Sequence, residues 1–181
     1  MIQPWPLESE ETLTELGFLK LRRNRARSPR TGQELDFYVL QTPDWVQVVP
    51  LAADGRLVLV RQYRHGSRAV GLEVPGGLLD AADPSPAHAA ARELAEETGY
   101  AGGELLALGA CWPQPALLSN RVHFFLARGV QPRREPALDH GEDLEVVLLA
   151  PGEAAKMAAD GRMHNAMSIM ALHLARAGGW L

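Results

Sequence analysis

The chain has 181 residues, of which 46% are hydrophobic and 22% are charged, and its formal net charge at pH 7 is −4. These values are typical of one globular domain, or of one domain with a short extension. They argue against broad nucleic-acid binding, which depends on clustered Lys and Arg. No run approaches 18 apolar residues, and the first residues lack a basic segment with an apolar core. We therefore expect neither a membrane span nor a signal peptide.

Residues 1–43 contain two strand-like runs, 17–21 and 35–40, with turn residues at 28–32 between them. This pattern predicts a small antiparallel β unit. Its core would be too small to be stable alone, so we expect it to pack on the main body or on a second copy of the chain. We place the domain boundary after this extension, which leaves residues 44–181 as the main domain.

Six basic residues cluster inside the extension, and two interpretations of them remain open. They form a solvated strand or hairpin, or one or two of the arginines contact substrate phosphates or a partner subunit. No aromatic platform or recognition helix accompanies the cluster, which argues against DNA binding. The six residues are Lys20, Arg22, Arg23, Arg25, Arg27 and Arg30.

The main domain alternates strand and helix patterns. Apolar runs at 46–49 and 57–60 flank an Asp-Gly hairpin signal at 53–56. Further strands are expected at 105–111, 122–126 and 144–149, and helices at 153–159 and 165–177. Helices alternating with a mixed sheet predict an α/β fold, an α/β/α sandwich. The single cysteine, Cys111, excludes a disulfide framework; it fits a small core residue and a cytoplasmic location.

Residues 76–99 combine a diglycine, predicted to form a tight turn, with a well-delimited helix. Ser85 is a good N-cap, and Pro86 suits the first helical position. Alanines fill the helix interior, where they favour helix formation. Gly99 suits the left-handed residue that ends a helix.

This helix carries three glutamates, Glu93, Glu96 and Glu97, with Arg92 beside them. Residues three and four apart are neighbours on a helix, so the carboxylates repel one another and contribute little to folding. A generic Glu-rich helix would be a solvated, salt-bridged face. Here the upstream glycines and the order Arg-Glu-Leu-x-Glu-Glu-x-Gly favour a divalent-cation site instead.

The segment resembles the signature box of the Nudix hydrolases. Residues 92–100, RELAEETGY, fit the second half of that box completely. The first half departs from it, because one residue is inserted between Gly77 and Arg92. The expected first glutamate falls on Asp83 or on Pro84, so this acidic position is either Asp83 or absent.

The runs before and after the box are similar to those of the ADP-ribose and nucleotide-sugar pyrophosphatases. These runs are residues 57–64, 72–77, 141–147 and 160–166. The resemblance implies the Nudix fold, a homodimer formed through the N-terminal region, and a Mg²⁺ cofactor with Mn²⁺ as the alternative. Mg²⁺ is a hard cation that prefers oxygen ligands. The implied substrate is a nucleoside diphosphate derivative.

The metal is expected on Glu93 and Glu97, which lie four residues apart, and by resemblance on the carbonyl of Gly76. Glu96 and Arg92 are assigned to the catalytic group beside them. By resemblance, a glutamate from a downstream loop activates the attacking water.

For this base we choose Glu142. Asp143 and Asp139 are its competitors in the same loop.

Arg61, Arg64 and Glu73 are the candidates for substrate contact. Guanidinium groups match phosphate geometry, although an ion pair with Glu73 is the rival explanation for either arginine. The expected reaction is hydrolysis of ADP-ribose or a nucleotide sugar to a nucleoside monophosphate and a sugar phosphate. Alternatives are a dinucleoside polyphosphate, a coenzyme A or an oxidised nucleotide as substrate, or a non-catalytic nucleotide-binding module on the same fold.

Overall fold

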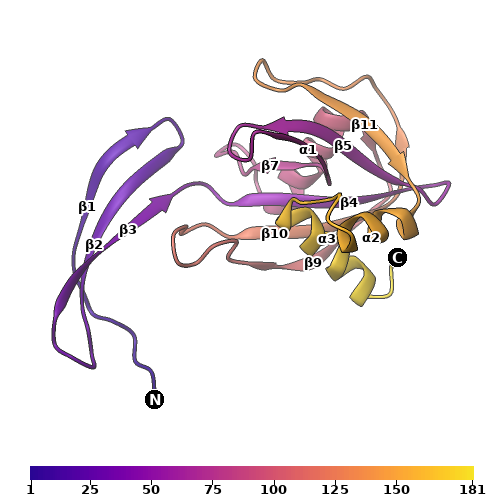
Figure 1. Ribbon diagram of the computed structural model, residues 1–181. Coiled ribbons are helices and arrows are strands. Elements are labelled where there is room, and N and C mark those ends of the chain that lie inside the picture. Colours follow the sequence, from indigo (N-terminus) through magenta and orange to yellow (C-terminus); the bar gives the residue numbers. More distant parts are fainter. The chain divides into compact units, whose positions relative to one another are not determined.

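A computed structural model describes residues 1–181 and divides the chain into two compact units. The first unit holds residues 1–44 and 112–121, and the second holds residues 45–111 and 122–181 (Figure 1). The short segment 112–121 thus groups with the N-terminal unit, although the sequence analysis placed it within the main domain.

The first unit is built on a three-stranded antiparallel sheet of β1 (Leu7–Leu16), β2 (Leu19–Arg27) and β3 (Glu34–Gln41). The predicted antiparallel unit is therefore confirmed. The strand expected at 17–21 is wrong at its start, because Gly17 has a φ of 61° and forms the turn between β1 and β2 with Phe18. Glycine adopts this left-handed conformation without steric cost.

Basic side chains of β2 pair with acidic side chains of β1 and β3 across this sheet. The structure favours the interpretation of a solvated, ion-paired sheet for these residues. Each exposed pair contributes little to stability, about 0–1 kcal/mol. The pairs are Lys20–Glu15, Arg22–Glu10, Arg23–Glu11, Arg25–Asp36, Arg27–Glu8 and Arg27–Glu34.

The second unit contains an eight-stranded mixed sheet, in which β10 runs parallel to β4 and all other pairs are antiparallel. The Asp-Gly hairpin is confirmed, since Leu51 pairs with Leu57 across it. The strands are β4 (Trp45–Ala52), β5 (Leu57–Arg64), β6 (Ala69–Glu73), β7 (Gly76–Leu78), β8 (Tyr100–Ala101), β9 (Glu104–Cys111), β10 (Val122–Pro132) and β11 (Leu144–Leu149).

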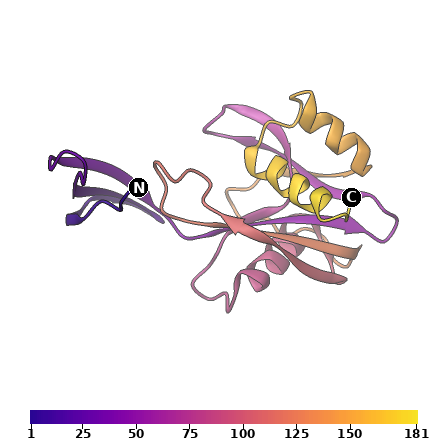
Figure 2. The same cartoon turned by 90° about the horizontal axis from the view of Figure 1, so that it is seen from below.

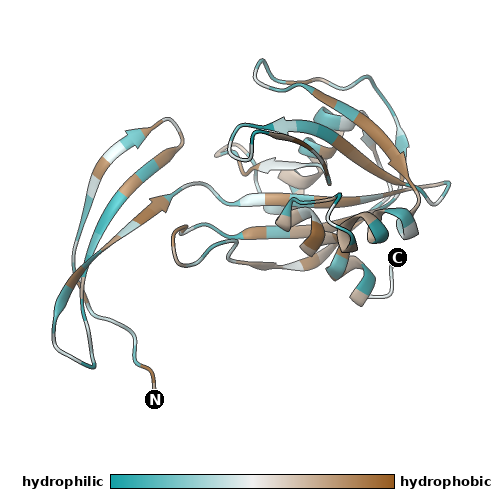
Figure 3. Cartoon of the chain, in the orientation of Figure 1, coloured by the Kyte–Doolittle hydropathy of each residue, from teal (hydrophilic) through white to brown (hydrophobic).

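Helix α1 (Pro86–Thr98) covers one face of this sheet, and α2 (Pro151–Ala159) and α3 (Ala166–Ala177) cover the other (Figure 2). Ala89, Ala90 and Leu94 of α1 pack in one core cluster with strand residues, and a second cluster lies beneath α2 and α3. The central strands are accordingly apolar (Figure 3). The α/β/α sandwich is confirmed. None of the three helices is both long and apolar enough to cross a membrane.

Strands β4 and β5 diverge directly after their hairpin, and this divergence positions the diglycine. Beyond the Leu51–Leu57 pair, β5 pairs with β6 while β4 pairs with β7. The connection between β6 and β7 is held to β4 by a hydrogen bond from Val48 N to the Pro75 carbonyl, 2.9 Å long. The diglycine that follows is therefore fixed opposite β4.

The C-terminal end of α1 anchors the segment that follows β10. Gly99 ends the helix with a φ of 73°, and its carbonyl accepts a hydrogen bond from Arg133 N at 2.9 Å. Ala137 N donates to the Glu96 carbonyl at 2.8 Å. The loop toward β11 thus starts from a fixed point on α1.

We predict that Gly99→Ala destabilises the protein more than Gly102→Ala does. Both glycines are left-handed, with φ of 73° and 80°, so both alanines carry a backbone cost of about 1–2 kcal/mol. Only at Gly99 would a Cβ also overlap the carbonyl of Arg134; at Gly102 the space is open. Denaturant unfolding measures the difference, and equal losses for the two variants would refute the proposed clash.

Candidate active site

Helix α1 presents the carboxylates, and its boundaries are those expected. The hydroxyl of Ser85 accepts a hydrogen bond from His88 N at 3.2 Å, and Pro86 occupies the first turn. With the start fixed in this way, Glu93 and Glu97 lie on the buried side of the helix, with exposed fractions of 8% and 3%. Glu96, between them, is more exposed.

The two buried carboxylates lie against the diglycine of β7. Glu97 Oε2 accepts a hydrogen bond from Gly76 N at 3.0 Å. A Cβ on Gly77 would come within 2.5 Å of Glu93 Oε1, and one on Gly76 would overlap the carbonyl of Val46. The prediction of a tight turn here was therefore wrong. The glycines form a short strand. A side chain at either position would not fit, because β4 lies too close to Gly76 and α1 lies too close to Gly77.

Burial makes these carboxylates costly to ionise. It raises the pKa of Glu97 to about 8, an effect only partly opposed by the hydrogen bond from Gly76. Burial also raises the pKa of Glu93, against the attraction of Arg92. The negative charges of Glu93 and Glu142 raise the pKa of Glu97 further. The protein therefore does not fully compensate the negative charge that these carboxylates carry when ionised, and it favours their protonated forms.

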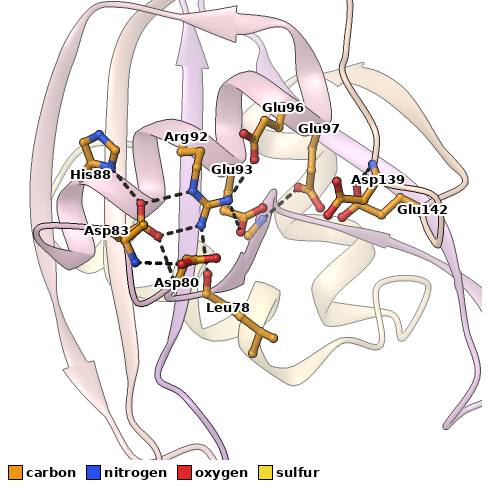
Figure 4. A network of polar contacts seen from close by, with 12 residues as sticks. Leu78, Asp80, Asp83, His88, Arg92, Glu93, Glu96, Glu97, Asp139 and Glu142 are labelled. Atoms are coloured by element: carbon orange, nitrogen blue, oxygen red, sulfur yellow. Dashed lines mark hydrogen bonds and ion pairs between the residues drawn. The ribbon is translucent and has the colours of Figure 1, made fainter. Parts of the chain in front are cut away.

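Arg92 donates to five oxygen atoms of four residues beside this group (Figure 4). Its Nη1 donates to Glu93 Oε1 and to Glu96 Oε2, both at 2.9 Å. Its Nη2 donates to the carbonyl of Leu78 at 3.2 Å and to Asp83 Oδ2 at 2.8 Å. The guanidinium thereby ties the helix to the loop that precedes it.

Asp83 is the acidic residue that the displaced box left uncertain, and the structure places it against Arg92. Its carboxylate also lies 2.8 Å from Nδ1 of His88. The hydrogen bonds from Arg92 hold the pKa of Asp83 far below its usual range. Asp83 closes a turn with Asp80, in which Asp83 N donates to the Asp80 carbonyl and Asp80 N to Asp83 Oδ2.

Glu142 lies near the helix carboxylates but is bonded within its own loop. Its Oε2 accepts a hydrogen bond from Asp139 N at 2.9 Å, and its N donates to the Asp139 carbonyl. Its charge contributes to the raised pKa values of Glu93 and Glu97, which places it within electrostatic reach of both. No three acidic, His or Cys side chains converge closely enough to form a preassembled cation site.

The two candidate arginines of β5 have different surroundings. Arg64 donates to both carboxylate oxygens of Glu73, which is 2% exposed, so the rival ion pair exists for this arginine. The charges of Glu97 and Glu142 also raise the pKa of Arg64, so Arg64 belongs to the same group. Arg61 instead pairs with Glu145 on β11, at 2.7 Å on the surface.

Two features of the site were not predicted from the sequence. The first is the contact of His88 with Asp83, which no spacing in the sequence indicates. A histidine in the first turn of a helix does not by itself indicate which side chain it will contact. The second is the anchoring of residues 133–137 on α1, which rests mainly on backbone hydrogen bonds and therefore leaves little side-chain pattern.

The residues present fit a divalent cation. Two buried carboxylates with raised pKa values lie within reach of a backbone segment of two glycines, where no side chain intervenes. Oxygen ligands of this kind are those that Mg²⁺ prefers. Arg92 supplies only part of the compensating charge, since it also binds Asp83.

We predict that Glu97→Gln stabilises the metal-free protein at pH 8, by about 1–3 kcal/mol after allowance for relaxation. Unfolded, Glu97 releases its proton near pH 4.3; folded, its pKa is about 8. Between these values the folded state binds more protons, so stability falls as pH rises. Glutamine keeps an acceptor for Gly76 N and removes this dependence. Unfolding at pH 5 and pH 8 tests this, and an unchanged pH dependence in the variant would count against it.

Comparison with known proteins places the chain in a family. The model of the NUDIX domain matches residues 42–168. The ADP-ribose pyrophosphatase of Mycobacterium tuberculosis is 31% identical over 174 residues, covering 94% of this chain and 84% of that protein. The GDP-mannose pyrophosphatase of Pectobacterium atrosepticum is 36% identical over 136 residues, 71% and 69% of the two chains. A solved structure of an ADP compounds hydrolase has the same fold, with a TM-score of 0.85, 23% identity and coverage of 100% and 99%. The chain belongs to the NUDIX family.

Proposed function

We propose that the protein hydrolyses the diphosphate bond of a nucleoside diphosphate derivative, ADP-ribose or a nucleotide sugar, to a nucleoside monophosphate and a sugar phosphate. The observation that carries this proposal is the pair of buried carboxylates, Glu93 and Glu97, against the diglycine of β7. Two relatives of the protein, an ADP-ribose pyrophosphatase and a GDP-mannose pyrophosphatase, support this substrate class.

Glu93, Glu97 and the carbonyl of Gly76 are the groups that would hold Mg²⁺, with Mn²⁺ as the alternative. When bound, the ion neutralises phosphate charge and makes a water molecule more acidic, which is what hydrolysis of a polyanionic diphosphate requires. Arg92 keeps Glu93 and Glu96 in place through its two hydrogen bonds from Nη1. Glu96 is the most exposed of the three glutamates; Arg92 binds its Oε2, and its other oxygen, Oε1, would hold an approaching water.

Arg64 and Glu73 serve the substrate in this proposal. Glu73 fixes the guanidinium at its Nε and Nη2 atoms, which leaves Nη1 to donate to a phosphate oxygen. The fixed orientation reduces the entropy lost on binding. Arg61 is the second candidate, because its pair with Glu145 is solvent-exposed and a phosphate could compete for it.

Glu142 is the proposed base, with Asp139 and Asp143 as its competitors. To accept a proton from water, its carboxylate must exchange the hydrogen bond with Asp139 N for one with the nucleophile. The anchor between Ala137 N and the Glu96 carbonyl fixes the start of the loop, so this exchange involves only the residues beyond Ala137.

We also propose a cytoplasmic homodimer formed through the N-terminal sheet. Large apolar side chains are exposed on this unit, and such a surface marks an interface in a stable protein. Burial on a second copy would remove them from water at about 25 cal/mol per Å². The exposed residues are Leu7, Leu13, Leu16, Phe18, Leu35, Phe37 and Tyr38.

We predict that the chain with Mg²⁺ converts ADP-ribose to AMP and ribose 5-phosphate, or a GDP-sugar to GMP and a sugar phosphate. Glu142→Gln should lower kcat about 10²–10⁴-fold, as loss of a general base does, whereas its neighbour's variant Asp143→Asn should stay within a few-fold of wild type. Mass analysis of products from a substrate panel checks both statements.

The outcomes separate the alternatives. A large loss in Asp143→Asn with an active Glu142→Gln would transfer the role of base to Asp143. No cleavage of any compound, with one of them raising the melting temperature, would replace the hydrolase by a nucleotide-binding module.

The homodimer predicts that Leu16→Glu yields a monomer in analytical ultracentrifugation while the wild-type chain sediments as a dimer. Val70→Glu is the matched control, because Val70 is equally exposed but lies on β6 of the second unit. A monomeric wild type, or a Leu16→Glu dimer of unchanged affinity, would rule out this interface.

A further inference from the structure

Asp83 is the most buried part of a polar network that reaches the surface. Its side chain is 3% exposed, and its two oxygens together meet Arg92, His88 and the backbone N of Asp80. A buried carboxylate needs such donors, since desolvation without them is costly. Of the side chains that contact Asp83, that of His88 is the more exposed, at 57%.

The same network ends on a proposed metal ligand. Asp83 binds Nε and Nη2 of Arg92, which leaves Nη1 directed at Glu93 and Glu96. The planar guanidinium is thus held along one edge by Asp83 and directs its other edge at Glu93. A rotation of Asp83 would therefore move the hydrogen bond that orients Glu93 (Figure 4).

His88 is fixed at the start of α1, and its ring contacts Asp83. Its backbone N donates to Ser85 Oγ at the start of α1, and its ring nitrogen Nδ1 lies 2.8 Å from Asp83 Oδ1. Arg92 already binds both oxygens of Asp83. The ring of His88 adds a further contact to Oδ1, so that two residues of α1, one helical turn apart, hold the carboxylate.

We propose that His88 is a positioning residue: with Asp83 it fixes Arg92, and through Arg92 the carboxylate of Glu93, for cation binding. The inference rests on the proposed metal-dependent function, because its effect is exerted on a metal ligand. A role restricted to stabilising the helix start is the competing explanation.

Calorimetric titration with Mg²⁺ and with Mn²⁺, combined with hydrolysis kinetics, separates these explanations. We expect His88→Ala to raise the metal Kd about 3–10-fold and Asp83→Asn about 10–100-fold, as supporting residues of metal ligands do. At saturating metal, His88→Ala should lower kcat and leave KM unchanged. His88→Asn places an amide N–H near the position of Nδ1 and should restore the metal Kd to within about twofold of wild type.

His173→Ala is the matched control, a histidine on the exposed surface of α3; it should leave metal binding and kinetics unchanged. The proposal is overturned if His88→Ala and Asp83→Asn bind metal as the wild type does, whatever their melting temperatures. It is overturned also if His88→Asn binds metal no better than His88→Ala. A wild-type chain that takes up neither metal refutes the proposed function itself, which distinguishes the two failures.

Discussion

The close contact between helix α1 and the diglycine strand β7 is the constraint on which the site depends. It removes Glu93 and Glu97 from water without giving either a full counter-charge. An uncompensated buried charge is among the most destabilising features a fold can contain. The chain tolerates it because the carboxylates can be protonated, and a divalent cation would relieve it more completely.

The rest of the second unit serves to hold this contact. The divergence of β4 and β5 places the diglycine opposite β4, and the alanines of α1 allow the helix to approach the sheet closely. On the side of the loop, Arg92 ties α1 to Leu78 and Asp83. At the end of the helix, the Gly99 carbonyl accepts a hydrogen bond from Arg133 N, in the segment that leads to Glu142. Packing forces and polar contacts therefore determine the positions of all the proposed catalytic groups.

Much of this could be predicted from the sequence because the signals are local. The caps Ser85 and Gly99 delimit α1, and the helical spacing of Glu93 and Glu97 puts them on one face. The strands that carry apolar runs were also found. The strand β6 was missed because it has only five residues, and β7 and β8 were missed because their partners, β4 and β10, are distant in the sequence. The role of the diglycine was misjudged for the same reason, since a close approach between elements is a tertiary property.

The surroundings of Asp83 show the same limit. Counting residues could not decide whether the displaced acid reaches Arg92, because a single inserted residue can be absorbed in a turn or can shift the helix. In the structure the acid lies in a turn from Asp80 to Asp83, and it contacts Arg92. Likewise, Arg61 and Arg64 are equivalent as residue types, and only the sheet distinguishes the arginine beside the carboxylates from the one paired with Glu145.

Thermal unfolding of the wild-type chain at pH 8, with and without Mg²⁺ at constant ionic strength, tests most directly whether the buried carboxylates require a cation. Millimolar Mg²⁺ should raise Tm by several degrees, through linkage of binding to folding, and the double variant Glu93→Gln, Glu97→Gln should lose this response. An equal shift in the double variant, or no shift in the wild type, would show that the carboxylate pair is not a cation site.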